Sequence, residues 1–295
     1  EACNIAHSLK KRVYVTVNIV FHNEDISGLK EYIKSLNECK VDAIIISDPL
    51  VIEISKEVAP NLEIHLSTQQ STIDYESCKF WSSVGVKRIV IGRETSREDK
   101  KEIIEKGNVD VETFIHGAMC VGYSGRCVLS NYLTNRDSNR GGCSQICRWN
   151  FKLFDKSKKE IKTSQRFSMT VKDLSMAKHI DELINLGIKS FKIEGRMRSI
   201  YYIATVINIY RKMIDAYFDN KQSYNEKYEY ILYRCANREA VSQYFERKPG
   251  VDEQYYIDRE EVSNKDFLGI VLDYDENNKE IIIEQRNYFK VFDEI

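Results

Sequence analysis

The first 117 residues alternate short β-branched runs with amphipathic stretches, and no other feature of the sequence restricts the fold as strongly. The strand-like runs fall at residues 13–18, 43–48, 63–68, 88–92 and 111–116. Strands separated by helices at this spacing pair in parallel, with helices packed outside the sheet. Polar residues such as Asn18, Asp48 and His116 end these runs, as expected at the face where barrel enzymes bind their substrates. The pattern predicts an α/β fold with a TIM-like barrel, and a doubly wound open sheet is the alternative.

Local signals place several helix boundaries. Pro49 is a favourable first helical residue, and Ser96 with Asp99 three residues later forms the pattern of a capping box. After a central interruption the rhythm resumes. We expect strands at 167–171 and 190–194, and helices at 173–186 and 199–218.

The character of the chain changes near residue 248. Two β-branched runs at 267–272 and 281–284 predict a β-hairpin. We therefore expect a barrel domain, a linker and the start of a small β domain over residues 1–247, 248–262 and 263–295.

Four of the eight cysteines fall within 28 residues as C-x6-C-x15-C-x3-C. These are Cys120, Cys127, Cys143 and Cys147. They lie in a segment, 118–151, that is rich in Gly, Ser, Asn and Arg and has neither helical nor strand periodicity. Four thiolates suit an iron–sulfur cluster or tetrahedral zinc. A zinc ribbon usually has two C-x2-C turns, which this segment lacks, so the spacing favours iron–sulfur over zinc and over unligated thiols.

Positive charge gathers in the same part of the chain. Residues 120–172 contain eleven Lys and Arg against three Asp and Glu, although the whole chain has a net charge of −1. Such an asymmetry predicts a basic face for phosphates or nucleic acid, with a solvated lysine-rich loop as the alternative. Arg126, Arg140 and Arg148 lie beside the cysteines and are candidates for binding a carboxylate or phosphate, or for structural pairing.

Other candidate residues end strands on the carboxyl side. His116 could donate a proton, and Lys192, Glu194 and Arg196 close the run at 190–194. We take His116, Glu194 and Lys192 as candidate catalytic residues. Lys172 and Arg196 are candidates for substrate binding, and structural ion pairs are the alternative for all of them.

Several classes of protein are disfavoured. No apolar run approaches the roughly 20 residues that span a bilayer, and no charged-then-apolar leader opens the sequence. We therefore expect a cytoplasmic protein with reduced thiols. The sequence has neither a G-x-S-x-G nor an H-E-x-x-H motif, which argues against simple proteolysis.

The cysteine segment resembles the signature of the collagenase-like peptidase family U32. The resemblance lies in residues 114–127, 139–143 and 147–149, and continues through 15–18, 65–69, 172–174 and 191–196. It implies a TIM-like barrel that lacks its first strands, followed by a truncated small β-barrel. It also implies that Cys120, Cys127, Cys143 and Cys147 ligate an iron–sulfur cluster, of the 4Fe–4S type.

The resemblance implies a divided function. The family takes its name from collagen-degrading peptidases, but some members resemble hydroxylation factors that use prephenate. We expect this chain to assist hydroxylation of a tRNA uridine. Arg126, Arg140, Arg148 and Arg196 would then bind a dicarboxylate such as prephenate. A peptidase and a structural metal-binding scaffold are the alternatives.

Overall fold

The computed structural model describes residues 1–163, 167–236, 238–255 and 266–294. The chain forms two compact units, each described here by itself. The first comprises residues 1–194 and 241–258, and the second comprises residues 195–240 and 259–295.

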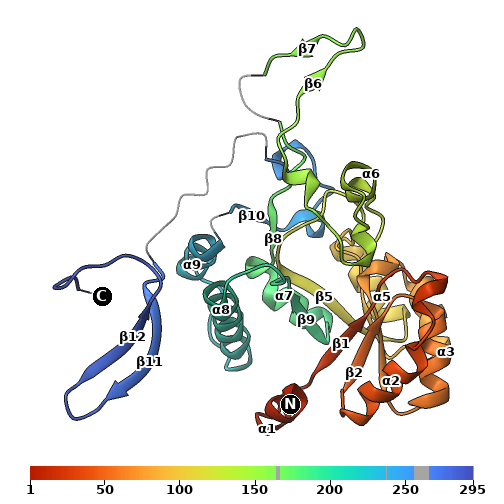
Figure 1. The fold of residues 1–295 in the computed structure, drawn as a ribbon, viewed down its shortest axis with the longest axis horizontal. Coiled ribbons are helices and arrows are strands. Elements are labelled where there is room, and N and C mark those ends of the chain that lie inside the picture. The colour runs from red at the N-terminus through yellow and green to blue at the C-terminus, as the bar shows by residue number, and fades with distance from the viewer. Residues whose placement is uncertain (164–166, 237, 256–265, 295) are drawn as a thin grey trace. The chain divides into compact units, whose positions relative to one another are not determined.

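Six parallel strands form the centre of the first unit (Figure 1). They are β1 (Tyr14–Val17), β2 (Ala43–Ile46), β3 (Glu63–Leu66), β4 (Arg88–Val90), β5 (Asp110–Gly117) and β9 (Ser190–Ile193). Each pairs with the next in this order. Every residue of β2 is buried, as expected for a strand with helices and neighbours on both faces. The predicted α/β class with a parallel sheet is confirmed. The described pairs do not join β9 to β1, so closure into a barrel stays a prediction.

Helices alternate with these strands. They are α1 (Ala2–Ser8), α2 (Leu29–Glu38), α3 (Pro49–Val58), α4 (Tyr75–Ser83), α5 (Arg97–Lys106) and α7 (Ile180–Leu186). Asp48 accepts a hydrogen bond from the Leu50 amide at the start of α3, with Pro49 at its first position. Ser96 and Asp99 form the predicted reciprocal capping box of α5. Short-range sequence signals therefore place these two helix starts correctly.

Two predicted boundaries beyond the insertion are wrong. Residues 167–171 form only isolated bridges, and the strand there is β8 (Asp173–Ser175), which pairs antiparallel with the end of β5. The helix predicted from residue 173 begins at Ile180 instead. Pairing with Gly117 and its neighbour holds the β8 backbone extended, so tertiary contact overrides the local helical pattern. The helix ends before Gly187, as predicted.

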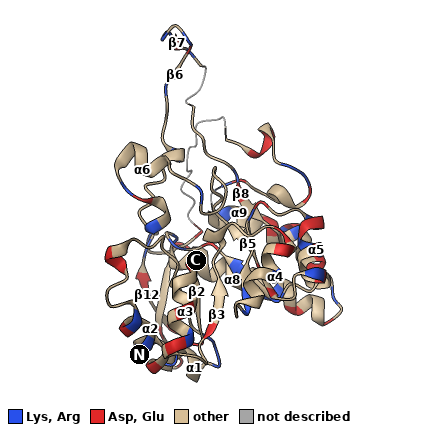
Figure 2. Ribbon diagram, turned by 90° about the vertical axis from the view of Figure 1, so that its right-hand side faces the viewer, with Lys and Arg blue, Asp and Glu red and all other residues tan. Residues whose placement is uncertain are grey.

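The connection from β5 to β8 is largely irregular. It contains α6 (Leu129–Thr134) and a small antiparallel hairpin of β6 (Leu153–Phe154) with β7 (Glu160–Ile161). The hairpin extends away from the sheet of the first unit (Figure 2).

The described residues of the second unit form two helices and a hairpin. Its elements are α8 (Ile200–Phe218), α9 (Glu226–Ala236) and the antiparallel pair β11 (Gly269–Asp275) with β12 (Glu280–Gln285); β10 (Ala240–Val241) lies at the division between the units. The hairpin predicted from the two β-branched runs is confirmed. The domain boundaries stay predictions, and residues 256–262 of the expected linker lie outside the described residues. None of the described helices is both long and apolar enough to cross a membrane.

Candidate functional site

The four clustered cysteines gather beyond the carboxyl end of β5. All are free thiols, and Cys120 follows the end of the strand by three residues. Burial raises the pKa of the Cys147 thiol, and the charges of Cys120, Cys143 and Cys127 raise it further. Burial also raises the pKa of Cys120, although this residue keeps solvent exposure. The thiols lie within electrostatic reach of one another, so the fold brings the predicted set together.

The four cysteines can be compared with the ligands that a zinc ion and an iron–sulfur cluster require. Within the described residues, no group of three or more His, Cys, Asp or Glu side chains is placed to hold a single metal ion. Zinc, with sulfur ligands at about 2.3 Å, requires such convergence. An iron–sulfur cluster contains several irons, so its four thiolates need not meet at one point. The donor set of four neighbouring free thiols has the chemistry of either an iron–sulfur cluster or a zinc site, so the cluster stays a prediction.

Glu94 fixes the first turn of the cysteine-rich insertion. This carboxylate follows β4, and its Oε1 accepts hydrogen bonds from the Ser124 amide at 2.6 Å and the Ser124 hydroxyl at 3.0 Å. Ser124 is buried, and it lies midway between Cys120 and Cys127 in the sequence. Hydrogen bonds to a carboxylate are stronger than those between neutral groups. The insertion is thereby attached to the carboxyl end of β4.

Gly125 makes a second attachment, at the carboxyl end of β3. Its backbone has φ +69°, a region that favours glycine, and a Cβ on it would collide with the carbonyl of Gln69. Only a residue without a side chain allows this close approach. The loop between the first two cysteines is therefore shaped by the ends of two neighbouring strands.

Arg140 makes a third attachment, after β1. Its Nη1 and Nη2 donate to the Asp25 carboxylate at 2.5 and 2.8 Å, and Nη1 also donates to the Val20 carbonyl at 2.6 Å. The Arg140 guanidinium holds the pKa of Asp25 well below its usual range. Substrate binding by Arg140 stays a prediction, but the structure already gives its guanidinium a structural partner.

The other predicted arginines differ in their contacts. Arg148 Nη1 donates to Gln145 Oε1 at 2.8 Å. Arg126 is exposed, and within the part of the chain that the structure describes its guanidinium has no ion-pair or hydrogen-bond partner, while its backbone amide donates to the Tyr123 carbonyl at 3.0 Å. Arg196 belongs to the second unit. Of the three predicted arginines in the insertion, Arg126 is therefore the one whose guanidinium is available for an anion.

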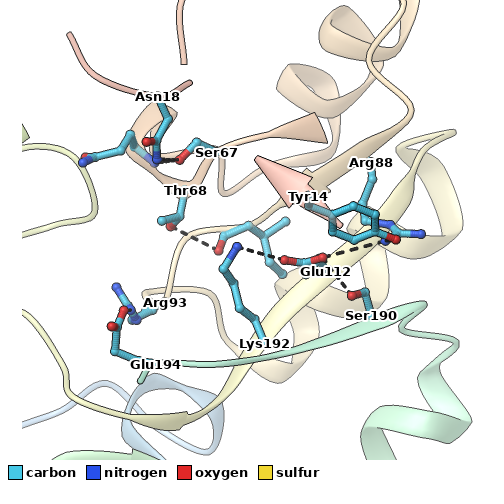
Figure 3. A network of polar contacts seen from close by, with 12 residues as sticks. Tyr14, Asn18, Ser67, Thr68, Arg88, Arg93, Glu112, Ser190, Lys192 and Glu194 are labelled. Carbon is cyan, nitrogen blue, oxygen red and sulfur yellow. Dashed lines mark hydrogen bonds and ion pairs between the residues drawn. The ribbon is translucent and has the colours of Figure 1, made fainter. Parts of the chain in front are cut away.

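Arg93 is a residue of the site that the sequence analysis does not single out. Its Nη2 donates to Glu194 Oε2 at 3.2 Å (Figure 3), and its guanidinium carbon lies 3.6 Å from the centre of the Phe114 ring. The Arg93 side chain is only 10% exposed, and its charge opposes the rise in the pKa of Cys120. Arg93 lies three residues after the end of β4, so its place near a strand end is the signal that could have identified it.

Lys192 is held by a buried carboxylate. Its Nζ donates to Glu112 Oε1 at 3.1 Å, and the Ser190 hydroxyl donates to Glu112 Oε2 at 2.8 Å (Figure 3). Arg88 Nη1 lies 3.8 Å from the same Oε2. Glu112 is 4% exposed and pairs with two cations, so Glu112, Lys192 and Arg88 form a largely buried charged cluster. Lys192 thus makes a structural ion pair, which was the alternative to a catalytic role in the sequence analysis.

Two further candidates are fixed through their backbones. His116 is buried at the end of β5, and its carbonyl accepts a hydrogen bond from the Glu194 amide at 2.9 Å. The Lys172 amide donates to the Glu253 carbonyl at 2.8 Å, and its own carbonyl accepts from Gln243 Nε2 at 2.6 Å. Glu194 thus lies between Arg93 and the end of β5. His116, Glu194 and Arg93 share the carboxyl side of the sheet with the cysteines.

Comparisons with known proteins give a consistent group of relatives. A family model described as peptidase family U32 matches residues 1–255. A tRNA hydroxylation protein of Bacillus subtilis (strain 168) is 44% identical over 302 residues, which cover 100% of this chain and 72% of the relative. A tRNA hydroxylation protein of Haemophilus influenzae is 36% identical and covers 71% of this chain and 56% of the relative. A 23S rRNA 5-hydroxycytidine synthase of Escherichia coli (strain K12) is 34% identical, with 75% and 33% covered.

Proposed function

The chain belongs to peptidase family U32, and from this relationship we propose that it is an RNA-modifying protein that takes part in hydroxylation of a tRNA uridine. The observation that carries the proposal is the 44% identity to a tRNA hydroxylation protein along the whole chain. The rRNA-modifying relative supports RNA as the substrate class, because it is a synthase of 5-hydroxycytidine in 23S rRNA. The chain spans 72% of one tRNA-related relative and 56% of another, so the activity is proposed for the whole protein.

Cys120, Cys127, Cys143 and Cys147 would hold an iron–sulfur cluster of the 4Fe–4S type. Such a cluster, when bound, would supply electron transfer or a site for an oxygen-containing substrate. The support for this assignment is the donor set of four free, neighbouring thiols. Glu94, Gly125 and Arg140 would keep the insertion that carries these thiols fixed over the ends of the strands.

The residues around the cysteines would bind and orient the reactants. Arg126 offers an exposed guanidinium for a dicarboxylate co-substrate such as prephenate, and planar bidentate pairing suits that role. Arg93 would place positive charge beside Cys120 while Glu194 and Phe114 hold its side chain in position. Closure of the parallel sheet into a barrel would surround these groups on the carboxyl side, where barrel enzymes carry their sites.

A complementation experiment tests the proposal. The full-length protein is expressed in a bacterial strain from which its gene has been deleted, and hydroxylated uridine in total tRNA is measured by mass spectrometry. Cys120→Ala and Cys143→Ala are compared with Cys39→Ala, an exposed cysteine outside the cluster. We expect the modification to be restored by the wild type and Cys39→Ala, and to be absent with the other two.

Two results would count against the proposal. Equal amounts of modified uridine with and without the gene would exclude the reaction. Cleavage of denatured collagen by the purified protein, lost on the same cysteine substitutions, would favour the peptidase alternative. Iron and sulfide analysis of protein purified without oxygen separates the cluster assignment from the reaction, because zinc would support a structural site.

A further inference from the structure

The hairpin of residues 152–162, here called the lysine arm, contributes little to the packing of the first unit. Residues 154–162 are all exposed. Its two larger apolar side chains, Phe154 and Ile161, keep 56% and 48% of their surface accessible. A hairpin with strands of two residues is marginal on its own, and this one buries little apolar area in return. The side chains of the arm therefore remain available to a partner.

The turn of the lysine arm is nevertheless ordered by one carboxylate. Asp155 Oδ1 accepts hydrogen bonds from the Ser157 amide and hydroxyl at 2.8 and 2.6 Å and from the Lys159 amide at 2.9 Å. These bonds lower the pKa of Asp155. The carboxylate is thus directed into its own turn, and the turn presents the lysines around it to solvent.

The lysine arm has an excess of positive charge, and most of it has no ion-pair partner among the described residues. It contains five lysines and two acids. Lys152 lies 3.4 Å from Glu160 in an exposed pair, which is worth little in water. The remaining four have no ion-pair partner within the described residues, and they are Lys156, Lys158, Lys159 and Lys162. Figure 2 shows this charge at the projecting end of the hairpin.

We propose that the lysine arm binds the phosphate backbone of the RNA substrate, away from the nucleotide that is modified. This inference rests on the proposed function and adds the surface that holds the RNA. Lysine ammonium groups on flexible stems suit closely spaced phosphates, which need charge rather than one fixed geometry. A protein partner would instead be expected to use a buried core of aromatic anchors. The arm offers mainly cations, so its chemistry favours a polyanion.

The test compares two variants of the full-length protein purified without oxygen. One carries Lys→Gln at residues 156, 158, 159 and 162. The matched control carries Lys→Gln at four exposed lysines outside the arm, namely residues 10 and 11 before β1, residue 34 on α2 and residue 40 before β2. Affinity for an unmodified tRNA transcript is measured between about 50 and 200 mM salt, because each phosphate contact adds roughly 0.7–0.9 to the slope of log affinity against log salt.

We expect the arm variant to lose about tenfold or more in affinity at low salt and to reduce the salt slope by about 3, while the control changes neither. Equal losses in both variants would indicate only a net-charge effect and would overturn the assignment to the arm. Unchanged tRNA binding by the arm variant, with wild-type modification of tRNA, would overturn it and leave the proposed function standing. Failure of the wild type to bind or modify tRNA would instead remove the proposed function. Unchanged tRNA affinity together with a loss of binding to anionic lipid vesicles would assign the arm to a membrane surface.

Discussion

Residues 118–151 and the lysine arm follow one another in the same connection between β5 and β8, yet the structure holds them differently. The cysteine-rich insertion is attached to the ends of three strands through Glu94, Gln69 and Asp25. The arm has an ordered turn and almost no contact with the core. A group that must hold four thiols in a fixed geometry needs such attachments. A surface that attracts phosphates needs accessible charge instead, and it functions without attachments to the strands.

The largest loss of stability is expected from a substitution at Gly125, where the insertion approaches the end of β3. Gly125→Ala adds a Cβ against the Gln69 carbonyl at φ +69°. We expect a loss of about 3 kcal/mol in the free energy of unfolding, combining the cost of the left-handed conformation with overpacking. Gly28→Ala is the matched control, because Gly28 has φ +81° but nothing within 4 Å of a Cβ. It should cost about 1 kcal/mol. Urea unfolding measures both, and equal losses would refute the close approach to Gln69.

A smaller effect is expected from Glu94→Gln. The substitution keeps the shape of the side chain but removes the charge that accepts both Ser124 hydrogen bonds. Hydrogen bonds to charged groups contribute about 1.5–3 kcal/mol, so we expect a loss near the lower end of that range and reduced iron content. The exposed Glu98→Gln on α5 should change stability by less than about 0.5 kcal/mol. An iron content equal to that of the wild type would show that Glu94 does not fix the insertion.

Asp25→Asn tests the third attachment through its pH dependence. The pKa of Asp25 is lowered in the folded protein by Arg140. A carboxylate with a lowered pKa stabilises the fold above its unfolded pKa of about 3.9, and this contribution is lost as the pH falls toward the folded value. The variant should therefore be less stable than the wild type at neutral pH, by less than Glu94→Gln, and the difference should shrink below about pH 4. Denaturant unfolding at several pH values measures it, and a constant difference would contradict the ion pair.

The two regions also differ in how far the sequence predicts them. The first five parallel strands, the helix start at Pro49 and the capping box of Ser96 with Asp99 follow from local patterns, and the structure confirms them. The cysteine set could be predicted because its members lie within 28 residues. The excess of lysine in the arm is equally visible in the sequence.

The attachments of the insertion could not be predicted, because they join residues distant in the chain. Ser124 and Glu94 are 30 residues apart, and Arg140 and Asp25 are 115 apart. Nothing in the local sequence distinguishes the paired Arg140 from the exposed Arg126. The pairing of Arg93 with Glu194 could not be predicted for the same reason, since the two residues lie 101 apart in the chain. Which arginine is occupied and which is available depends on the packing of loops over the strand ends.

The smallest effect on stability is expected for substitutions in the lysine arm. This result would distinguish the arm from the insertion, whose attachments contribute to stability. Lys→Gln at residues 156, 158, 159 and 162 removes no ion pair among the described residues and leaves the Asp155 turn intact, because that turn uses the backbone of Lys159. Exposed substitutions of this kind change stability by about 0.5 kcal/mol or less each. Thermal unfolding should therefore be nearly unchanged, and iron content should equal that of the wild type. A marked loss of either would mean that the lysines support the insertion. Unchanged stability together with weakened tRNA binding would show that the arm binds the RNA and that the insertion holds the thiols without it.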